Sequence, residues 1–308
     1  ALPLVLGSYL QHVLTIGFYY VILSASWNLL AGFTGQFSLA QHAFAGMGGY
    51  TSALLVLYAP QLGMFVGVPE LRVPLWAGVL AGTLAAGLVG YLLGIVCLSM
   101  RRIYLALTTW AFAESFRLWI ATEYRFTRGD LGLSTDLFFG TADPFAYYYL
   151  FLAAMVATLL ILFEIYRSPI GYFLRAIRDD EEAAQAMGVD SFLWKKFAFS
   201  ASSALAGFGG GLLAHYIGLL TPTPMRFNEM AIIIIMVITG GLGKLWGPVV
   251  GALFIQVVSE LLRAYAEIRM VLFALAVIVI MRFYRDGLVG ILGALEARLR
   301  RRPPGPRS

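Results

Sequence analysis

Long apolar runs separated by short polar stretches make up most of this chain of 308 residues. A helix needs about 20 mainly apolar residues to cross a bilayer, and the runs lack the two-residue alternation of a transmembrane β-strand. The pattern therefore predicts an all-α polytopic membrane protein with about nine transmembrane helices, within a range of eight to ten. The expected spans are 11–31, 43–58, 75–99, 103–120, 145–166, 197–219, 230–242, 247–262 and 270–283.

Two of these runs, 43–58 and 230–242, are short and rich in small residues at one end. We expect broken or re-entrant segments there, because non-helical backbone within a bilayer is tolerated where it lines a cavity in the protein. The stretches AGTLAAGLVGYLLG (81–94) and SALAGFGGGLLA (203–214) repeat small residues at helical spacing. Such faces let helices approach closely in lipid, so these two runs are predicted to pack tightly.

The positive charges are distributed unevenly along the chain. Of its 22 Lys and Arg, 14 lie in Arg101–Arg102, in 167–196 and in 282–308. The positive-inside rule assigns all three segments, and the C-terminus, to the cytoplasm. The pattern predicts one transmembrane domain over 1–308, with 167–196 as a cytoplasmic loop and 284–308 as a basic cytoplasmic tail. Because that tail follows an apolar run, we expect it to contact the bilayer surface and not nucleic acid.

The stretch RAIRDDEEAAQAMGVD (175–190) is a polar island with two Arg and five acids in a chain that is 60% hydrophobic. Ser168 and Pro169 predict the start of a first helix, whose apolar stripe we expect to lie along the inner leaflet while Arg175 and Arg178 reach the headgroups. A second helix is predicted from Asp179, which forms a capping box with Glu182. Gly188 is a natural terminator for it.

Several stretches of the sequence resemble a known family. Residues Glu182–Gly188 match the EAA-x-x-x-G loop of bacterial ABC importer permeases, and the chain is similar to the branched-chain amino acid permeases of the LivM type. The matching stretches run through most of the chain in family order. They are WNLLAGFTGQFSLAQHAFAGMGGYTSALL (27–55), RRIYLALTTWAFAESFR (101–117), SPIGYFLRAIRDDEEAAQAMGVD (168–190), ALAGFGGGLLA (204–214) and GGLGKLWGPVVGA (240–252).

The resemblance implies a subunit of a transporter in the bacterial inner membrane. Its partners would be a second permease, which the family suggests is a paralogue, two cytoplasmic ABC ATPases and a periplasmic substrate-binding protein. The EAA loop would dock on the ATPases and couple ATP hydrolysis to transport. The expected docking residues are Arg178, Asp179, Glu181, Glu182, Ala183, Ala184, Met187 and Gly188.

No enzymatic activity is expected of the chain itself. Gly243-Lys244 is followed by Leu245 and lacks the glycine spacing of a P-loop. ATP and Mg²⁺ are therefore expected on the partner ATPases, and this chain is expected to bind no cofactor. The single Cys97 and the three histidines fit no metal-site spacing.

Polar residues inside apolar runs mark a candidate substrate pathway, because such groups are costly in a bilayer. The expected residues are Gln36, Ser38, Gln41, His42, Thr108, Thr109 and Glu114. Glu114 can pair with Arg117 on one helix face, either as a structural ion pair or beside the pathway. The segment around Gln36–His42 is either a broken helix that faces substrate or a cytoplasmic turn before a close-packed helix.

Several alternatives remain open from the sequence. Urea, short amides or aromatic acids are other substrates for the same class of importer. A secondary transporter or channel would carry more charged groups within the membrane than the one Glu114–Arg117 pair. A membrane enzyme would need a convergent set of catalytic residues, and none is apparent in the sequence. The similarity of GFTGQF (32–37) to GGLGKL (240–245) is either a trace of an internal repeat or chance.

Overall fold

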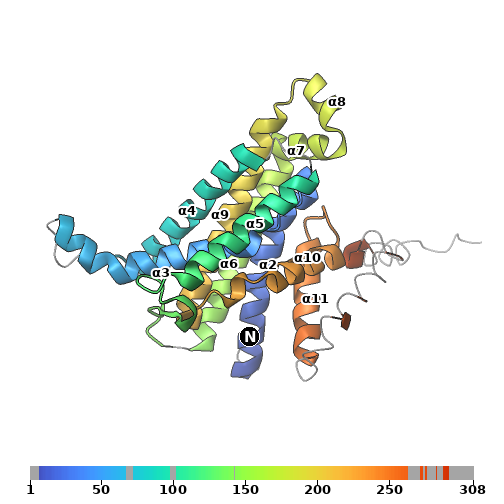
Figure 1. Cartoon of the computed structure of the whole chain (residues 1–308). Coiled ribbons are helices and arrows are strands. Elements are labelled where there is room, and N and C mark those ends of the chain that lie inside the picture. Colours follow the sequence, from blue (N-terminus) through green and yellow to red (C-terminus); the bar gives the residue numbers. More distant parts are fainter. Residues whose placement is uncertain are drawn as a thin grey trace, which may run out of the picture.

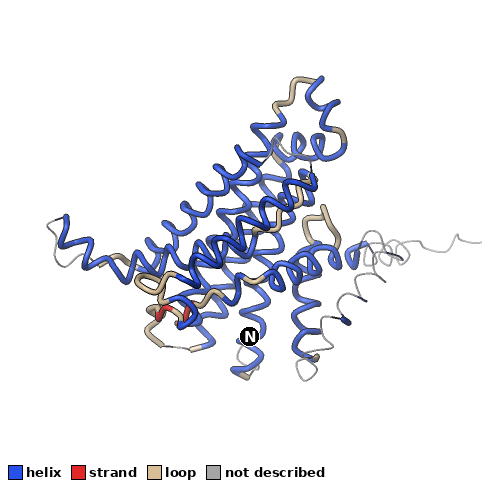
Figure 2. Tube along the Cα trace, viewed as in Figure 1, coloured by secondary structure: helices blue, strands red, loops and turns tan. Residues whose placement is uncertain are grey.

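A computed structural model describes residues 7–66, 72–97, 102–141 and 143–262, with a few short pieces between 271 and 290. Helices form almost all of the described chain, and the only strands there are two short ones (Figure 2). The elements are α2 (Ser8–Thr34), α3 (Gln41–Val66), α4 (Leu75–Cys97), α5 (Arg102–Thr122), η1 (Gly129–Leu131), β1 (Leu133–Ser134), α6 (Pro144–Arg167), α7 (Pro169–Asp179), α8 (Glu181–Ala186), α9 (Ser191–Ile217), β2 (Leu219–Leu220), η2 (Thr223–Met225), α10 (Phe227–Gly240) and α11 (Gly247–Leu261).

Eight of the nine expected spans correspond to helices, which confirms an all-α polytopic membrane protein. Within the described residues, α2, α4, α6 and α9 are long and apolar enough to cross a bilayer by themselves. The helices α10 and α11 are short, as expected for the first of them, whereas α3 continues past Pro60 to Val66 and is longer than predicted. The ninth span at 270–283 and the tail at 284–308 lie largely outside the described residues.

Close contacts between glycines hold α3, α4 and α9 together. A Cβ on Gly48 or Gly210 would overlap the backbone carbonyl of Gly207 or of Ala45 on the neighbouring helix. A Cβ on Gly82 would likewise overlap the carbonyl of Gly48. Larger side chains at these positions would force the helices apart, so the stretches 81–94 and 203–214 do serve close packing, as predicted.

The two ends of the bundle differ in structure. Figure 1 places α7 and α8 at one end and the N-terminus of α2 at the other. At the second end β1 pairs with β2 in antiparallel register, and Thr135 donates through its backbone N–H to the carbonyl of Gly218. The loops after α5 and after α9 therefore meet at one end, opposite the loop 167–196, as the alternation of spans predicts.

The chain turns back into the bundle between α2 and α3. After Gly35, which ends α2 with a φ of 69°, residues 35–40 are non-helical. Trp27 donates its indole N–H to the carbonyl of Ser38 at 2.8 Å, so the segment runs back beside the last turns of α2. The expected broken or re-entrant structure is wrong for 43–58, which lies within the continuous helix α3, and for 230–240, which lies within α10. The non-helical segment lies before α3 instead, so α3 begins inside the bundle and not at its surface.

Candidate functional site

The expected coupling helix exists, but it begins one residue later than predicted. The N-cap of α8 is Asp180, whose carboxylate accepts the backbone N–H of Ala183 at 3.0 Å. Asp179 is the last residue of α7 and pairs with Arg178, so the capping box of Asp179 with Glu182 is wrong. The two acids are adjacent and equally suited to cap a helix. Because α7 continues through Asp179, the cap of α8 falls to Asp180.

The C-terminus of α8 is closed by a Schellman motif. The N–H of Gly188 donates to the carbonyl of Gln185 at 2.9 Å, and that of Val189 donates to the carbonyl of Ala184 at 3.1 Å. Gly188 has a φ of 85°, and a Cβ there would meet no atom within 4 Å. In this chain Gly188 therefore provides the left-handed turn and does not make room for a neighbouring segment.

Burial separates the residues expected to fit a partner. Ala184 is buried against this chain itself, whereas Ala183 and Glu182 are exposed and Met187 is 85% exposed. Glu181 is half-buried and bonds through Oε1 to Nζ of Lys195 at 2.5 Å, which holds α8 to the first turns of α9. Of the expected docking residues on α8 and its C-terminal turn, Glu182, Ala183, Met187 and Gly188 are exposed to another protein.

The first helix of the island packs its apolar stripe on the bundle. Leu174 and Ile177 of α7 are buried, and the ring of Phe173 lies 5.4 Å from that of Trp194 on α9. The guanidinium of Arg175 lies 4.4 Å from the ring centroid of Tyr166. The amphipathic stripe was predicted correctly, but its partner is protein and not lipid.

Arg178 joins α7 to two other parts of the chain. Its Nη1 donates to the carbonyl of Gly32 at 3.0 Å, near the end of α2. A Cβ on Gly243 would lie 2.8 Å from the same nitrogen, so the loop between α10 and α11 is also in contact with Arg178. That loop is fixed to α2 by Asn28, whose side chain accepts from the N–H of Gly243 at 2.8 Å and donates to the carbonyl of Lys244 at 3.0 Å.

The two similar segments 32–37 and 240–245 therefore lie against each other at the coupling end. Gly32 has no room for a Cβ, which would be 2.7 Å from the backbone nitrogen of Gly243. The sequence singled out both segments but did not indicate that they meet. Asn28 was missed altogether, because one Asn in an apolar run gives no sign of its partner.

Three of the seven expected pathway residues hold the turn between α2 and α3. Gln41 donates to Ser26 at 2.6 Å and to the carbonyl of Ser202 at 3.2 Å. Thr109 accepts the N–H of Leu39 at 2.9 Å, and the hydroxyl of Ser38 accepts the N–H of Ala40. These side chains are buried and fix the position at which α3 starts.

Gln36 in this turn and His42 in the first turn of α3 differ from the others. Oε1 of Gln36 and Nδ1 of His42 are buried and have no hydrogen-bond partner in the described part of the chain. Buried polar atoms without a partner are uncommon and call for an explanation. His42 also lines two cavities, whose volumes are about 30 and 150 Å³.

The remaining pathway candidates lie on α5. Glu114 and Arg117 form the expected ion pair, with Nε of Arg117 3.1 Å from both carboxylate oxygens. The side chain of Arg117 is 18% exposed and that of Glu114 is 33% exposed. Thr108, on the same helix, is half-buried. The pairing predicted from the spacing is present, and each partner neutralises the other.

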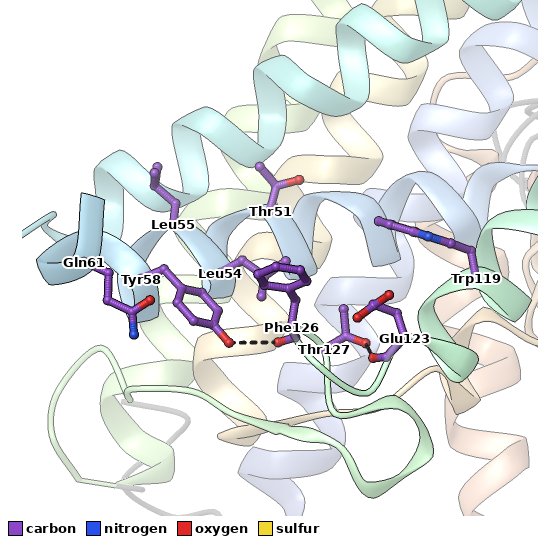
Figure 3. A pocket seen from close by; sticks show the side chains of 9 residues that line it. All are labelled: Thr51, Leu54, Leu55, Tyr58, Gln61, Trp119, Glu123, Phe126 and Thr127. Carbon is purple, nitrogen blue, oxygen red and sulfur yellow. Dashed lines mark hydrogen bonds between the residues drawn. The ribbon is translucent and has the colours of Figure 1, made fainter. Parts of the chain in front are cut away.

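A larger pocket of about 620 Å³ lies between α3, α5 and the loop that follows α5 (Figure 3). Its wall includes Leu54, Tyr58 and Trp119, and Tyr58 donates to the carbonyl of Phe126 at 3.4 Å. Glu123 at its edge accepts the N–H of Arg125 at 3.1 Å. None of the pathway residues expected from the sequence lines this pocket.

Comparison with known proteins gives a consistent set of matches. A family model described as "Branched-chain amino acid transport system / permease component" matches residues 9–281. The permease protein LivM of the high-affinity branched-chain amino acid transport system of Escherichia coli K12 is 30% identical over 305 residues, which cover 90% of this chain and 69% of LivM. A probable LivM permease of Methanocaldococcus jannaschii is 24% identical, with 82% and 81% covered.

A second kind of permease also matches. The LivH permease protein of the corresponding system of Salmonella typhimurium is 22% identical over 301 residues, which cover 92% of this chain and 94% of LivH. The search of solved structures gave no match.

Proposed function

Because this chain belongs to the family of permease components of branched-chain amino acid transport systems, we propose that it is the membrane-spanning subunit of an ATP-driven importer. Its substrates are branched-chain and other hydrophobic amino acids, carried from the periplasm to the cytoplasm. The observation that supports the coupling role most directly is α8. This short helix has both ends satisfied by its own chain and still exposes Met187 to water.

The contacts of Arg178 supply the route by which a movement of α8 reaches the transmembrane helices. The helix α8 follows α7 after one residue, and Arg178 in the last turn of α7 bonds to α2 and touches the loop 241–246. A shift of α7 by a docked ATPase would therefore act on the end of α2 and on the α10–α11 hairpin together. Helices packed in this way move as rigid elements.

The similarity to both LivM and LivH permeases supports a paired permease as partner, and we infer a paralogue. Two cytoplasmic ATPases, which bind ATP and Mg²⁺, and a periplasmic binding protein complete the proposed importer. Its location is the inner membrane, with loop 167–196 and the C-terminus in the cytoplasm. The basic residues of these segments support that orientation.

Uptake by the complete importer in proteoliposomes tests the proposal. We expect uptake of labelled L-leucine that requires ATP inside the vesicles and the binding protein outside, and that persists with a proton uncoupler. Uptake driven by a proton or sodium gradient without ATP would contradict the proposal and would support a secondary transporter.

A matched pair of variants tests the coupling surface. Met187→Asp places a charge on the docking surface, and we expect the ATPases no longer to co-purify with the permease pair. Leu131→Asp changes a residue that is 78% exposed in the loop after α5, at the opposite end, and should leave co-purification unchanged. Retention of the ATPases by Met187→Asp would show that α8 is not their docking site.

A further inference from the structure

The 150 Å³ cavity at His42 combines an apolar wall with a small number of polar groups. Helices α2, α3, α9 and α10 meet around it, together with Pro224 of η2. Its wall is formed by the aliphatic side chains of Ile16, Leu23, Leu213, Ile217 and Ile233. The polar groups are His42, Glu229, Tyr19 and Tyr20. Sites for small molecules have this composition, with a mostly apolar lining and a few polar groups that fix orientation.

His42 differs from the other buried histidine of the described chain. His215 on α9 is fully buried, and both of its ring nitrogens are bonded, Nε2 to Ser52 at 2.8 Å and Nδ1 to the carbonyl of Asp136 at 2.8 Å. His42 is 3% exposed, and its Nδ1 has no partner within the described residues. The protein therefore satisfies one buried imidazole completely and leaves Nδ1 of the other without a partner within the described residues, although His42 lies in the wall of the cavity.

Glu229 supplies the opposite kind of group. It lies in the first turn of α10, and its Oε2 accepts the hydroxyl of Tyr20 at 2.7 Å. No Lys, Arg or His forms a salt bridge with it in the part of the chain that the structure describes. A carboxylate accepts about four hydrogen bonds, so Glu229 keeps acceptor capacity beyond the bond from Tyr20. It also lines an adjoining cavity of about 190 Å³.

We propose that this cavity binds a zwitterionic amino acid with an aliphatic side chain. The ammonium group bonds to the carboxylate of Glu229, and the carboxylate group accepts a hydrogen bond from Nδ1–H of His42. The side chain lies against the aliphatic wall. This assignment rests on the proposed transport of amino acids and adds the residues that recognise each end of the substrate. Neither Glu229 nor Tyr20 was expected from the sequence, in which Glu229 lies just before the predicted span 230–242.

Binding to the permease pair in lipid nanodiscs, without ATPases or binding protein, tests the site directly. Labelled L-leucine is displaced by unlabelled leucine, by isopentylamine, which lacks the carboxylate, or by 4-methylpentanoate, which lacks the ammonium group. For the wild type we expect each truncated compound to compete at least about tenfold more weakly than leucine, because a site built for a polar group rejects an analogue without it.

Two variants should lose this discrimination at opposite ends. Glu229→Gln should no longer recognise the ammonium group, so leucine and 4-methylpentanoate should compete nearly equally. His42→Phe should no longer recognise the carboxylate, so leucine and isopentylamine should compete nearly equally. Tyr20→Phe, which removes one bond to Glu229 and leaves the carboxylate, should keep the preference for leucine. A merely structural role for His42 or Glu229 would lower stability without changing which compound is preferred.

Thermal unfolding provides a second readout. His215→Phe should lower the midpoint because it breaks two bonds, whereas His42→Phe should not lower it as far. The site proposal is overturned if the wild-type pair binds no leucine, or if both variants keep the wild-type preference. Those results would leave the proposed function intact as long as the complete importer takes up leucine with ATP. Failure of that uptake would contradict the proposed function itself.

Discussion

The docking surface of α8 and the cavity at His42 differ in what each leaves without a partner. The backbone ends of α8 are satisfied by Asp180 and the Schellman turn, and what remains exposed is the apolar side chain of Met187. In the cavity the apolar walls are buried, and what remains is a polar nitrogen of His42.

The difference indicates the kind of partner that each region takes. An exposed apolar side chain on a rigid helix gains most from another protein surface, where it is removed from water. A buried polar atom gains most from a small ligand that carries a complementary polar group. One chain therefore offers two chemically opposite sites, at its coupling end and inside its bundle.

The largest effect on uptake is expected from Arg178, which connects α7, next to the docking helix α8, to α2 and to the loop between α10 and α11. Arg178→Ala removes the bond to Gly32 and the contact with Gly243. A hydrogen bond to a charged group contributes about 1.5–3 kcal/mol, so we expect ATP-driven uptake to fall by about tenfold or more. ATPase binding should persist, because the exposed face of α8 is unchanged.

Arg175→Ala is the matched control on the same helix. Arg175 lies over the rings of Tyr166 and Tyr172 and does not bond to α2. Its removal should reduce uptake much less. Equal loss of uptake in both variants would argue against Arg178 as the specific link, and loss of ATPase binding in Arg178→Ala would place it at the docking surface.

A smaller effect is expected inside the bundle, without any change at α8. A Cβ on Gly46 would meet the flexible thioether end of Met225, and both residues line the 30 Å³ cavity beside His42. In Gly46→Ala we expect Met225 to shift and leucine binding to weaken several-fold. ATPase co-purification should equal that of the wild type. Unchanged leucine affinity would show that this part of the cavity does not contact substrate.

Gly188→Ala tests whether α8 must be closed by a left-handed residue. Its φ of 85° is unfavourable for a residue with a Cβ, at a cost of about 1–2 kcal/mol. Hydrogen exchange of 181–187 should become faster and ATPase affinity should fall modestly. The affinity should recover in Gly188→Asn, because Asn tolerates this conformation better than Ala does.

The smallest effects separate the two neighbouring acids. Asp180→Ala should destabilise α8 by about 1 kcal/mol through loss of the N-cap, measured as faster hydrogen exchange in 181–187. Asp179→Ala removes only an exposed pair with Arg178 and should leave the exchange unchanged. The opposite result would restore Asp179 as the cap.

The order of the helices and the existence of α7 and α8 could be predicted from the sequence. Apolar length predicts spans because lipid cannot satisfy backbone groups, and the charges of 175–190 exclude that stretch from lipid. The glycine-rich faces of 81–94 and 203–214 predicted close packing, because small residues at helical spacing let two helix backbones approach each other closely. These properties depend on residues near one another in the chain.

Only the tertiary structure decided which side of each element meets which partner. Ala184 and Ala183 are neighbours of the same type, and the position of α8 buries one and exposes the other. His42 and His215 are both buried in apolar runs, and only contacts made by distant residues satisfy the second. The cavity brings together Tyr20, His42 and Glu229 from three helices. Local pattern does not encode such long-range pairings, because each depends on how the whole bundle packs.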